Sequence, residues 1–454
     1  MKLIKKKKMK TINLFCNLIV ILLFTGLSMN PVVAQTTKKE NVTKVYGISQ
    51  SGNLDITSSF GTNIEILTWD RNEVKVVSEL TYEDGNNKDD IDKLLNAFKN
   101  MSAESSRNAL KLNLILIKSS SHNGRAFRRS ENTTILYNDD KTSLDGSKIK
   151  TTYTIWIPET LNVKADSKFG KIKMSSIKGN VDFNLSNNNL EMGDFGESGI
   201  FNTRFSAITI GSGGTSKFDV NNGNVNASGL KNVTIDARFS NFNIEKAHDV
   251  SMIFNNGTAV FGTLNDIDVS ARFSTIRIEN NAGKSKFDFQ NSKFFGKSFQ
   301  TMEISARFSN FKVASTGNIK INSSNNSNFD FGTVNAIVCR ESRFSTFEFE
   351  EIVIEASFPD TNNSDIFVNR TSALFTGFSG NFRFGMVQLK IDPSVEYNLI
   401  YNATFGKLRV SPEKFKTKYN VTENPGSKTY IHGINAGARC NIELVTSNTT
   451  CRIE

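Results

Sequence analysis

The chain has 454 residues and carries 55 Lys and Arg against 45 Asp and Glu, a net charge of +10. Six lysines lie in the first ten residues and no acid lies in the first 34, so the remaining 420 residues hold 49 basic and 45 acidic residues, about +4. This balance gives no support to nucleic-acid binding, which needs a clustered basic face. Three His and four Cys offer few side chains for metal binding or nucleophilic catalysis.

Residues 1–34 have the pattern of a secretory signal peptide. Lysines between Lys5 and Lys10 precede an apolar stretch that runs from Ile12 to Leu27, and small residues then stand before a cleavage site at Gln35. The alternative is an uncleaved membrane anchor, although polar residues interrupt the stretch and it is short for a full span. We therefore predict export, with no transmembrane span after cleavage.

Residues 35–160 are expected to form an N-terminal β module that contains one short helix and caps the repeat region behind it. The segments 73–82 and 109–118 alternate like strands. Between them, apolar residues recur at helical spacing after Asp89-Asp90, which can cap a helix. These apolar residues are Ile91, Leu94, Leu95 and Phe98.

Residues 161–410 contain a repeat. Five copies share an RFS motif at spacings of 34, 34, 35 and 36 residues. Their central residues are Phe205, Phe239, Phe273, Phe308 and Phe344. Weaker copies are centred on Phe60, Phe169, Phe378 and Phe405. Between the strong copies lies a second element that carries Phe261, Phe295 and Phe331, each followed by Gly.

The alternation around the motif indicates strands and corners. Val233, Ile235 and Ala237 share the parity of Phe239, so all four are expected to point inward while Arg238 points outward. The parity then slips by one, which indicates a corner between two strands at the small residue that follows Phe. The stacked motif Phe side chains would thus form much of the core.

These features predict an all-β fold, a parallel β-helix whose coils stack about 4.8 Å apart. Residues 411–454 would close its end. A β-propeller is the main rival, but its common repeats run to about 40–45 residues. An outer-membrane barrel needs apolar outward positions, which polar residues occupy here. The number of coils per repeat stays open.

Three cysteines follow the signal peptide: Cys339, Cys440 and Cys451. A turn-like SNTT lies between the last two, so one expectation is a hairpin with a Cys440–Cys451 disulfide in an oxidising compartment. The other is two unpaired thiols. Cys339 is expected to stand alone.

At this point the residues resemble a known family. Residues 59–80, a short helix, the IWIP strand at 155–158 and the RFS units are similar to the secreted adhesin-like β-helix proteins of Gram-negative bacteria. The resemblance implies a right-handed β-helix, an envelope or extracellular location and surface adhesion. Related repeats often read KYS where this chain reads RFS, so the hydroxyl is absent here. The resemblance assigns no mechanism to any residue.

Few residues suggest chemistry. His122, His248 and His432 lie in separate segments, with no partner at metal-ligand spacing. Carboxylates cluster at Asp266 and Asp268 and again in the segment 348–351, where they alternate with apolar residues as on a solvated strand face. A polysaccharide-cleaving enzyme would need two carboxylates that face each other. We predict no catalytic residue, no metal and no cofactor.

The most specific candidate is a column of outward arginines at equal positions of the repeats: Arg204, Arg238, Arg272, Arg307 and Arg343. Such a column could bind carboxylates or phosphates, or serve only as a solubilising face. The sequence thus favours an exported, monomeric, non-enzymatic adhesin-like or scaffold protein of the cell envelope, with an acidic polysaccharide or an envelope protein as partner. A polysaccharide-active β-helix enzyme and a periplasmic signalling component with a protein partner remain the alternatives.

Overall fold

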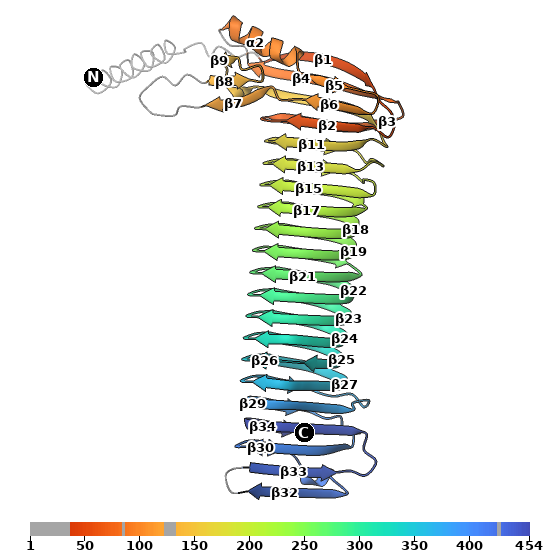
Figure 1. Cartoon of the computed structure of the whole chain (residues 1–454), viewed down its shortest axis with the longest axis vertical. Coiled ribbons are helices and arrows are strands. Elements are labelled where there is room, and N and C mark those ends of the chain that lie inside the picture. The colour runs from red at the N-terminus through yellow and green to blue at the C-terminus, as the bar shows by residue number, and fades with distance from the viewer. Residues whose placement is uncertain (1–36, 84–86, 122–132, 425–427) are drawn as a thin grey trace, which may run out of the picture.

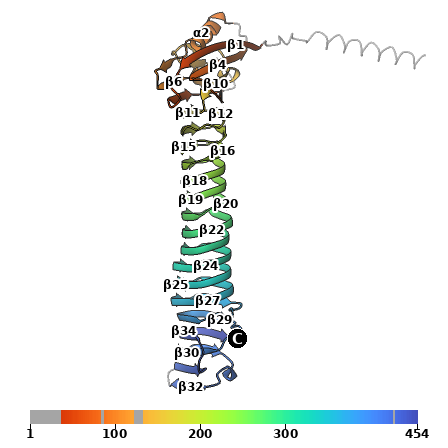
Figure 2. The same cartoon turned by 90° about the vertical axis from the view of Figure 1, so that its right-hand side faces the viewer.

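The computed structural model describes residues 37–83, 87–121, 133–424 and 428–454. The signal peptide predicted for residues 1–34 and His122 lie outside these residues. The chain forms a rod in which stacked coils run from an N-terminal module to the C-terminus (Figures 1 and 2). The predicted all-β class is confirmed, since the rod is a parallel β-solenoid of about 13 turns with one helix. Strands that face the viewer in Figure 1 run leftwards as the chain descends, so the coil is right-handed.

The N-terminal module is a sheet laid over the first coil. β1 (Thr37–Gly47) runs antiparallel to β4 (Glu73–Glu83), which in turn runs antiparallel to β10 (Lys150–Pro158). β10 pairs in parallel with β3 (Thr62–Trp69). The remaining elements are β2 (Asn53–Ser58), β5 (Ala103–Ser105), β6 (Ala109–Asn113), β7 (Ile117–Ser121), β8 (Thr133–Leu136), β9 (Lys141–Thr142) and the 3-10 turn η1 (Gly146–Lys148).

The predicted helix is confirmed as α2 (Lys88–Lys99), with Leu94 and Phe98 buried against the module. Its N-cap is Asn87, whose side chain accepts a hydrogen bond from the backbone N–H of Asp89. Asp90 is buried instead of capping, because it accepts a 3.0 Å hydrogen bond from the Ser143 backbone N–H. The helix therefore packs on the N-terminal module, in a cluster that Phe60 also contacts.

The solenoid starts before the helix. β2 and β3 form its first coil around Phe60, and the chain then leaves to build the module. It returns with β11 (Asn162–Lys168) stacked in parallel on β2 and β12 (Gly170–Met174) stacked on β3. Phe60 is therefore the same unit as the later repeats, as predicted.

The next coils are 17 or 18 residues long in the central part of the rod, so each 34-residue repeat holds two coils. Register shows this, because Arg204 pairs with Asn221 and Asn221 with Arg238. In each coil we term the strand before the corner residue the leading strand and the strand after it the trailing strand.

The solenoid strands are β13 (Val181–Ser186), β14 (Asn189–Met192), β15 (Ser198–Arg204), β16 (Ala207–Gly213), β17 (Thr215–Asn221), β18 (Asn224–Arg238), β19 (Asn241–Asn255), β20 (Thr258–Thr263), β21 (Asp266–Arg272), β22 (Thr275–Gln290), β23 (Lys293–Arg307), β24 (Asn310–Asn325), β25 (Asn328–Cys339), β26 (Ser342–Arg343), β27 (Thr346–Asn362), β28 (Asp365–Val368) and β29 (Gly377–Leu389).

The core consists of inward side chains stacked coil on coil. Val233, Ile235 and Ala237 are buried, as the alternation predicts. Phenylalanines within the strands form stacks, and the rings of Phe329 and Phe347 lie parallel with centroids 4.8 Å apart. Burial of each such ring is worth roughly 1.5–3 kcal/mol, so the apolar ladders stabilise the rod.

The expectation that the motif Phe residues join this core is wrong. Phe239 has a φ of +52° and is 60% exposed. The leading strand ends at Arg238, and the left-handed residue turns the chain and directs the aromatic ring outward. Ser240 takes the inward place, and its hydroxyl donates a 2.7 Å hydrogen bond to the Arg238 carbonyl. The parity slip thus occurs at Phe, while Ser fills the interior of the corner.

One further Phe expectation is wrong, and the second element of the repeat is not uniform. Phe378, taken as a repeat centre, is buried, and Phe384 occupies that corner with a φ of +55°. Phe261 and Phe331 are buried, but Phe295 points outward because Gly296 takes the register position facing Val313. The corner thus lies six positions after Phe378, and in the second element the buried residue is Phe294, next to Phe295.

The C-terminal strand β34 (Cys440–Ile453) inserts between β29 and β30 (Tyr397–Thr404), parallel to both. The end is then closed by the antiparallel strands β33 (Lys428–Ile434) and β32 (Lys418–Asn424). β31 (Lys407–Arg409) and the 3-10 turn η2 (Pro412–Lys414) complete this part. The hairpin expected between Cys440 and Cys451 does not form, since both lie on β34 with its corner at Asn448, and both thiols are unpaired.

Candidate binding face

The predicted arginines lie in one row, at the end of the leading strands. Parallel pairing aligns each Arg with an amide or hydroxyl residue one coil away and with the next Arg two coils away. In order, the row contains Lys168, Ser186, Arg204, Asn221, Arg238, Asn255, Arg272, Gln290, Arg307, Asn325, Arg343, Asn362 and Arg383. All five predicted arginines are exposed, and we call this line the arginine row.

Arg383 belongs to the same row and was missed by the sequence reasoning. Its repeat reads NFRFG instead of RFS, so the motif search centred on Phe378. The signal that could have found it is the Arg-Phe pair alone, since Phe384 has the left-handed φ of the other corners.

A second line runs beside the arginine row, at the corner itself. Every corner residue in the regular part of the rod has a positive φ, and the residue is alternately Phe and Asn. We call this line the corner ladder. Its members are Phe169, Asn187, Phe205, Asn222, Phe239, Asn256, Phe273, Asn291, Phe308, Asn326, Phe344, Asn363 and Phe384. Each Phe follows an Arg or, for Phe169, a Lys.

The Phe members of the ladder carry a cost that packing does not offset. A residue other than Gly in the left-handed region costs roughly 1–2 kcal/mol, and Asn tolerates it better because its side chain bonds locally. From Phe169 to Phe384 these rings are 48–62% exposed. They therefore recover little of the free energy that burial gives to the strand phenylalanines. The intervening asparagines show which residue the backbone accepts at less cost.

The charge of the arginine row is largely uncompensated. Arg343 forms a 2.8 Å ion pair with Glu341, and Arg383 a 2.7 Å ion pair with Asp360. Within the described parts of the chain, Arg204, Arg238 and Arg272 have no carboxylate in salt-bridge distance. The middle of the row thus presents positive charge beside exposed aromatic rings, and we call the two lines together the corner face.

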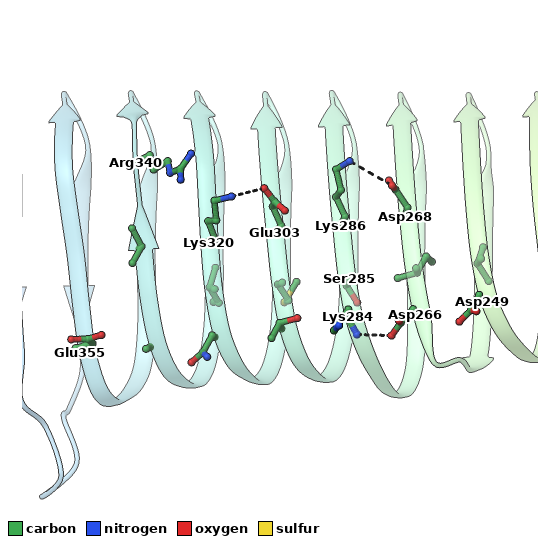
Figure 3. A pocket seen from close by; sticks show the side chains of 18 residues that line it. Asp249, Asp266, Asp268, Lys284, Ser285, Lys286, Glu303, Lys320, Arg340 and Glu355 are labelled. Atoms are coloured by element: carbon green, nitrogen blue, oxygen red, sulfur yellow. Dashed lines mark hydrogen bonds and ion pairs between the residues drawn. The ribbon is translucent and has the colours of Figure 1, made fainter.

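A second candidate is a groove on the same leading strands, further from the corner (Figure 3). It is a hollow of about 840 Å³ lined by acidic and basic side chains, among them Asp266, Asp268, Lys286, Glu303, Lys320 and Glu355. Charges of opposite sign face each other across coils, at 3.5 Å for Asp268–Lys286 and 2.8 Å for Glu303–Lys320. The groove therefore contains carboxylates and basic groups together, as a polysaccharide-active enzyme would require.

The electrostatics of the groove do not suit acid catalysis. Hydrogen bonds from Lys320 and Asn322 hold the pKa of Glu303 below its ordinary value. A general acid needs the opposite shift, which burial away from cations provides. The carboxylates of the segment 348–351 lie elsewhere, with Glu348 and Glu350 exposed on a trailing strand. In the groove, Asp268 and Glu303 are thus paired with lysines of the next coil.

The other candidates add no chemistry. His248 is exposed beside Asp249, and His432 is exposed on β33. Among the described residues, no group of three or more His, Cys, Asp or Glu could hold a metal ion. Burial raises the pKa of each of the three cysteine thiols to about 12, so none is an activated nucleophile. No helix in the described ranges is long and apolar enough to cross a membrane.

Comparisons with known proteins identify no family. No family model and no curated protein matches the chain. One matching solved structure is described as a "putative cell adhesion protein" from Clostridium sporogenes ATCC 15579. It is 9% identical, the match covers 92% of this chain and 99% of that one, and the TM-score is 0.16. At this identity and TM-score the match carries no weight for function, which has to be inferred from the surface of the chain itself.

Proposed function

We propose that the protein is an exported, non-enzymatic, adhesin-like module of the cell envelope that binds its target along the corner face. The corner ladder is the observation that carries this proposal. Exposed phenylalanines stand in the left-handed region at every second coil, where Asn holds the same backbone in the coils between. Backbone strain at repeated surface positions indicates that these residues serve a function other than stabilising the fold.

The shape of the molecule supports a presenting role. About 13 coils at roughly 4.8 Å each make a straight rod about 60 Å long. The rod displays the same chemical groups at regular intervals along one edge. Repeat proteins use such extended surfaces for binding, because each coil adds one more copy of the same contact.

The enzyme alternative rests on the groove alone. Two of its carboxylates, Asp268 and Glu303, are paired with lysines, and hydrogen bonds from Lys320 and Asn322 lower the pKa of Glu303. These features support a stable charged surface more than a reacting centre. The signalling alternative needs a protein partner, and the corner face would then be its docking surface.

Bead adhesion tests the proposal. The full chain is expressed with its leader, and the exported product is sequenced from its N-terminus, where Gln35 is expected. Beads coated with this product are counted on immobilised bacterial envelopes. A variant with Phe239, Phe273 and Phe308 changed to Asn should lose at least tenfold of the bound beads, because Asn preserves the corner and removes the ring.

The matched control changes three lysines on the leading strands outside the corner face, Lys217, Lys286 and Lys320, to Gln. This variant should bind like the wild type. The proposal is overturned if coated beads bind no better than bare beads, or if the Asn variant binds equally well. A protein retained in the cytoplasm would overturn the exported part.

A further inference from the structure

We infer that the corner face binds a linear polysaccharide that carries one carboxylate per disaccharide and lies along the axis of the rod. The inference rests on the proposed function and names its ligand class. It comes from the alternation between the two coils of each repeat. In most repeats one coil carries Arg in the arginine row and Phe in the corner ladder, and the other carries an amide in the row and Asn in the ladder.

The spacing of the arginines is the first step. Each Arg of the row is two coils from the next, about 9.6 Å at the spacing of stacked strands. This distance corresponds to a disaccharide in an extended β-linked chain. From Arg204 to Arg383 the row holds six arginines over ten coil steps, about 48 Å. A polymer with a strictly regular charge can follow such a row without interruption.

The residues between the arginines are the second step. At the intervening coils the row has an amide at Asn221, Asn325 and Asn362. In these pairs the neighbouring corner Asn donates to the amide oxygen, as Asn222 does to Asn221 at 2.6 Å and Asn363 to Asn362 at 2.7 Å. The amide NH₂ group of the row is thereby left to donate outward. The row therefore alternates guanidinium with amide, as an alternation of acidic and neutral sugars requires.

The aromatic rings are the third step. From Phe205 to Phe384 each corner Phe follows an Arg in the sequence, and the guanidinium of Arg307 lies 5.4 Å from the ring centre of Phe308. A guanidinium can grip a carboxylate with two parallel hydrogen bonds. The adjacent ring offers an apolar face to the C–H face of the same sugar. Arg and Phe together thus form one subsite, repeated at every second coil.

Other polyanions fit the spacing less well. A DNA strand carries one phosphate per 3.4 Å of helix axis, about three charges for each arginine. An extended β-strand alternates its side chains, so acidic residues three apart would point to opposite faces. A polyproline II peptide rises about 9.3 Å in three residues and matches the distance. It matches the row only if an acidic residue recurs at every third position over the whole length.

Binding of defined oligosaccharides tests the inference. Hyaluronan oligosaccharides carry one carboxylate per disaccharide, and oligogalacturonates of equal length carry one on every sugar. Hyaluronan should bind more tightly than oligogalacturonate. Its affinity should rise at least tenfold from four to twelve sugars and then level off, because the six arginines match six disaccharides once Arg343 and Arg383 exchange their ion pairs with Glu341 and Asp360 for sugar carboxylates. A neutral cello-oligosaccharide and a (Glu-Pro-Pro)ₙ peptide complete the set of probes.

A spacing variant separates periodic recognition from general attraction. Exchanging neighbours, with Asn255→Arg and Arg272→Asn, preserves the net charge and moves one arginine by a coil. It should weaken the binding of the twelve-sugar hyaluronan at least threefold. The variant with Lys217, Lys286 and Lys320 changed to Gln loses three positive charges away from the row and should bind as the wild type does.

Each remaining outcome decides against the inference in a distinct way. Equal binding of hyaluronan and oligogalacturonate, or no effect of the exchange, means attraction without periodic recognition. Binding of the Glu-Pro-Pro peptide alone would make the ligand a protein segment. If no probe binds while the coated beads still adhere to envelopes through the corner face, the ligand class is wrong and the proposed function stands.

Discussion

The corner face and the groove share the same leading strands and use charge in opposite ways. In the groove, opposite charges alternate from coil to coil and pair, as Lys320 does with Glu303 at 2.8 Å. In the middle of the corner face, Arg238 and Arg272 stand two coils apart with no acidic partner among the described residues, beside exposed rings held at a positive φ. Paired charges hold neighbouring coils in register, whereas charges without a partner and strained rings contribute little to the fold, which is why we propose the corner face as the binding surface.

A comparison of two phenylalanines gives the largest expected effect. The ring of Phe329 is buried between Phe311 and Phe347, at 5.3 and 4.8 Å. Its replacement by Ala should lower the free energy of unfolding by about 3–5 kcal/mol, because the cavity cannot close between stacked coils. Phe308→Ala should change it by less than about 1 kcal/mol, because the ring is exposed. Urea titration followed by circular dichroism measures both, and similar losses would remove the distinction between core and corner.

Alkaline pH should destabilise the interior. Burial raises the pKa of the thiols of Cys339, Cys440 and Cys451 to about 12, against an ordinary value of 9.0. The unfolded chain therefore loses these protons first as the pH rises above 9. The stability that the buried thiols contribute is complete below pH 9 and is lost as the pH rises towards 12. The urea midpoint should fall between pH 8 and pH 10.5.

A thiol introduced at the corner supplies the control for this prediction. In Phe308→Cys, a maleimide at pH 8 should label the exposed thiol at once, while the three native thiols react only after unfolding. The native thiols should react far more slowly than the introduced one, at a rate set by unfolding, because only an exposed thiolate reacts. In a variant with all three native cysteines changed to Ala, the midpoint should fall less with pH. Fast labelling of Cys339 in the folded wild type would contradict the closed interior.

The strain at the corner predicts a smaller effect of opposite sign. Phe308 has a φ of +51°, close to the +50° of Asn291 and the +48° of Asn326 in the adjoining coils. Phe308→Asn should raise the free energy of unfolding by about 1 kcal/mol while weakening the binding of the target. The reverse change, Asn326→Phe, should lower stability by a similar amount. A fall in stability for Phe308→Asn would mean that the ring supports the fold after all.

The sequence predicts the strands well and the corner poorly, for a physical reason. Alternation places Val233, Ile235 and Ala237 inward because the side-chain period of a strand is two. The same alternation places Phe239 inward. Because Phe239 itself adopts a left-handed backbone conformation, its side chain points outward instead. The clue lies halfway between the RFS motifs, where Asn-Gly or Asn-Ser recurs, as at Asn256-Gly257. Asn favours a positive φ, so it identifies the corner that Phe occupies in the other coil.

The arginine row could be predicted because equal positions in repeats must align in a solenoid. The groove and the path of the C-terminal strand could not. Asp268 and Lys286 meet only through the coil register, since 18 residues separate them in sequence. Insertion of β34 between β29 and β30 places Cys440 and Cys451 along one strand. No local sequence pattern predicts this insertion. A hairpin with a disulfide and two unpaired thiols were therefore equally valid interpretations of the same residues.

The ion pairs of the groove should show the smallest effect. Glu303 and Lys320 are 2.8 Å apart, but their side chains are 39% and 42% exposed, and exposed pairs contribute about 0.2–1 kcal/mol. Glu303→Gln should therefore lower the free energy of unfolding by no more than this amount at pH 7. Because the Lys320 and Asn322 hydrogen bonds lower the pKa of Glu303, its contribution is present above the ordinary pKa of 4.5 and is lost as the pH falls. Urea midpoints of wild type and variant should thus differ at pH 7 and converge near pH 3. A loss of several kcal/mol at pH 7, or a difference that persists at pH 3, would mean that the paired charges of the groove are not the weak, register-holding contacts that distinguish it from the corner face.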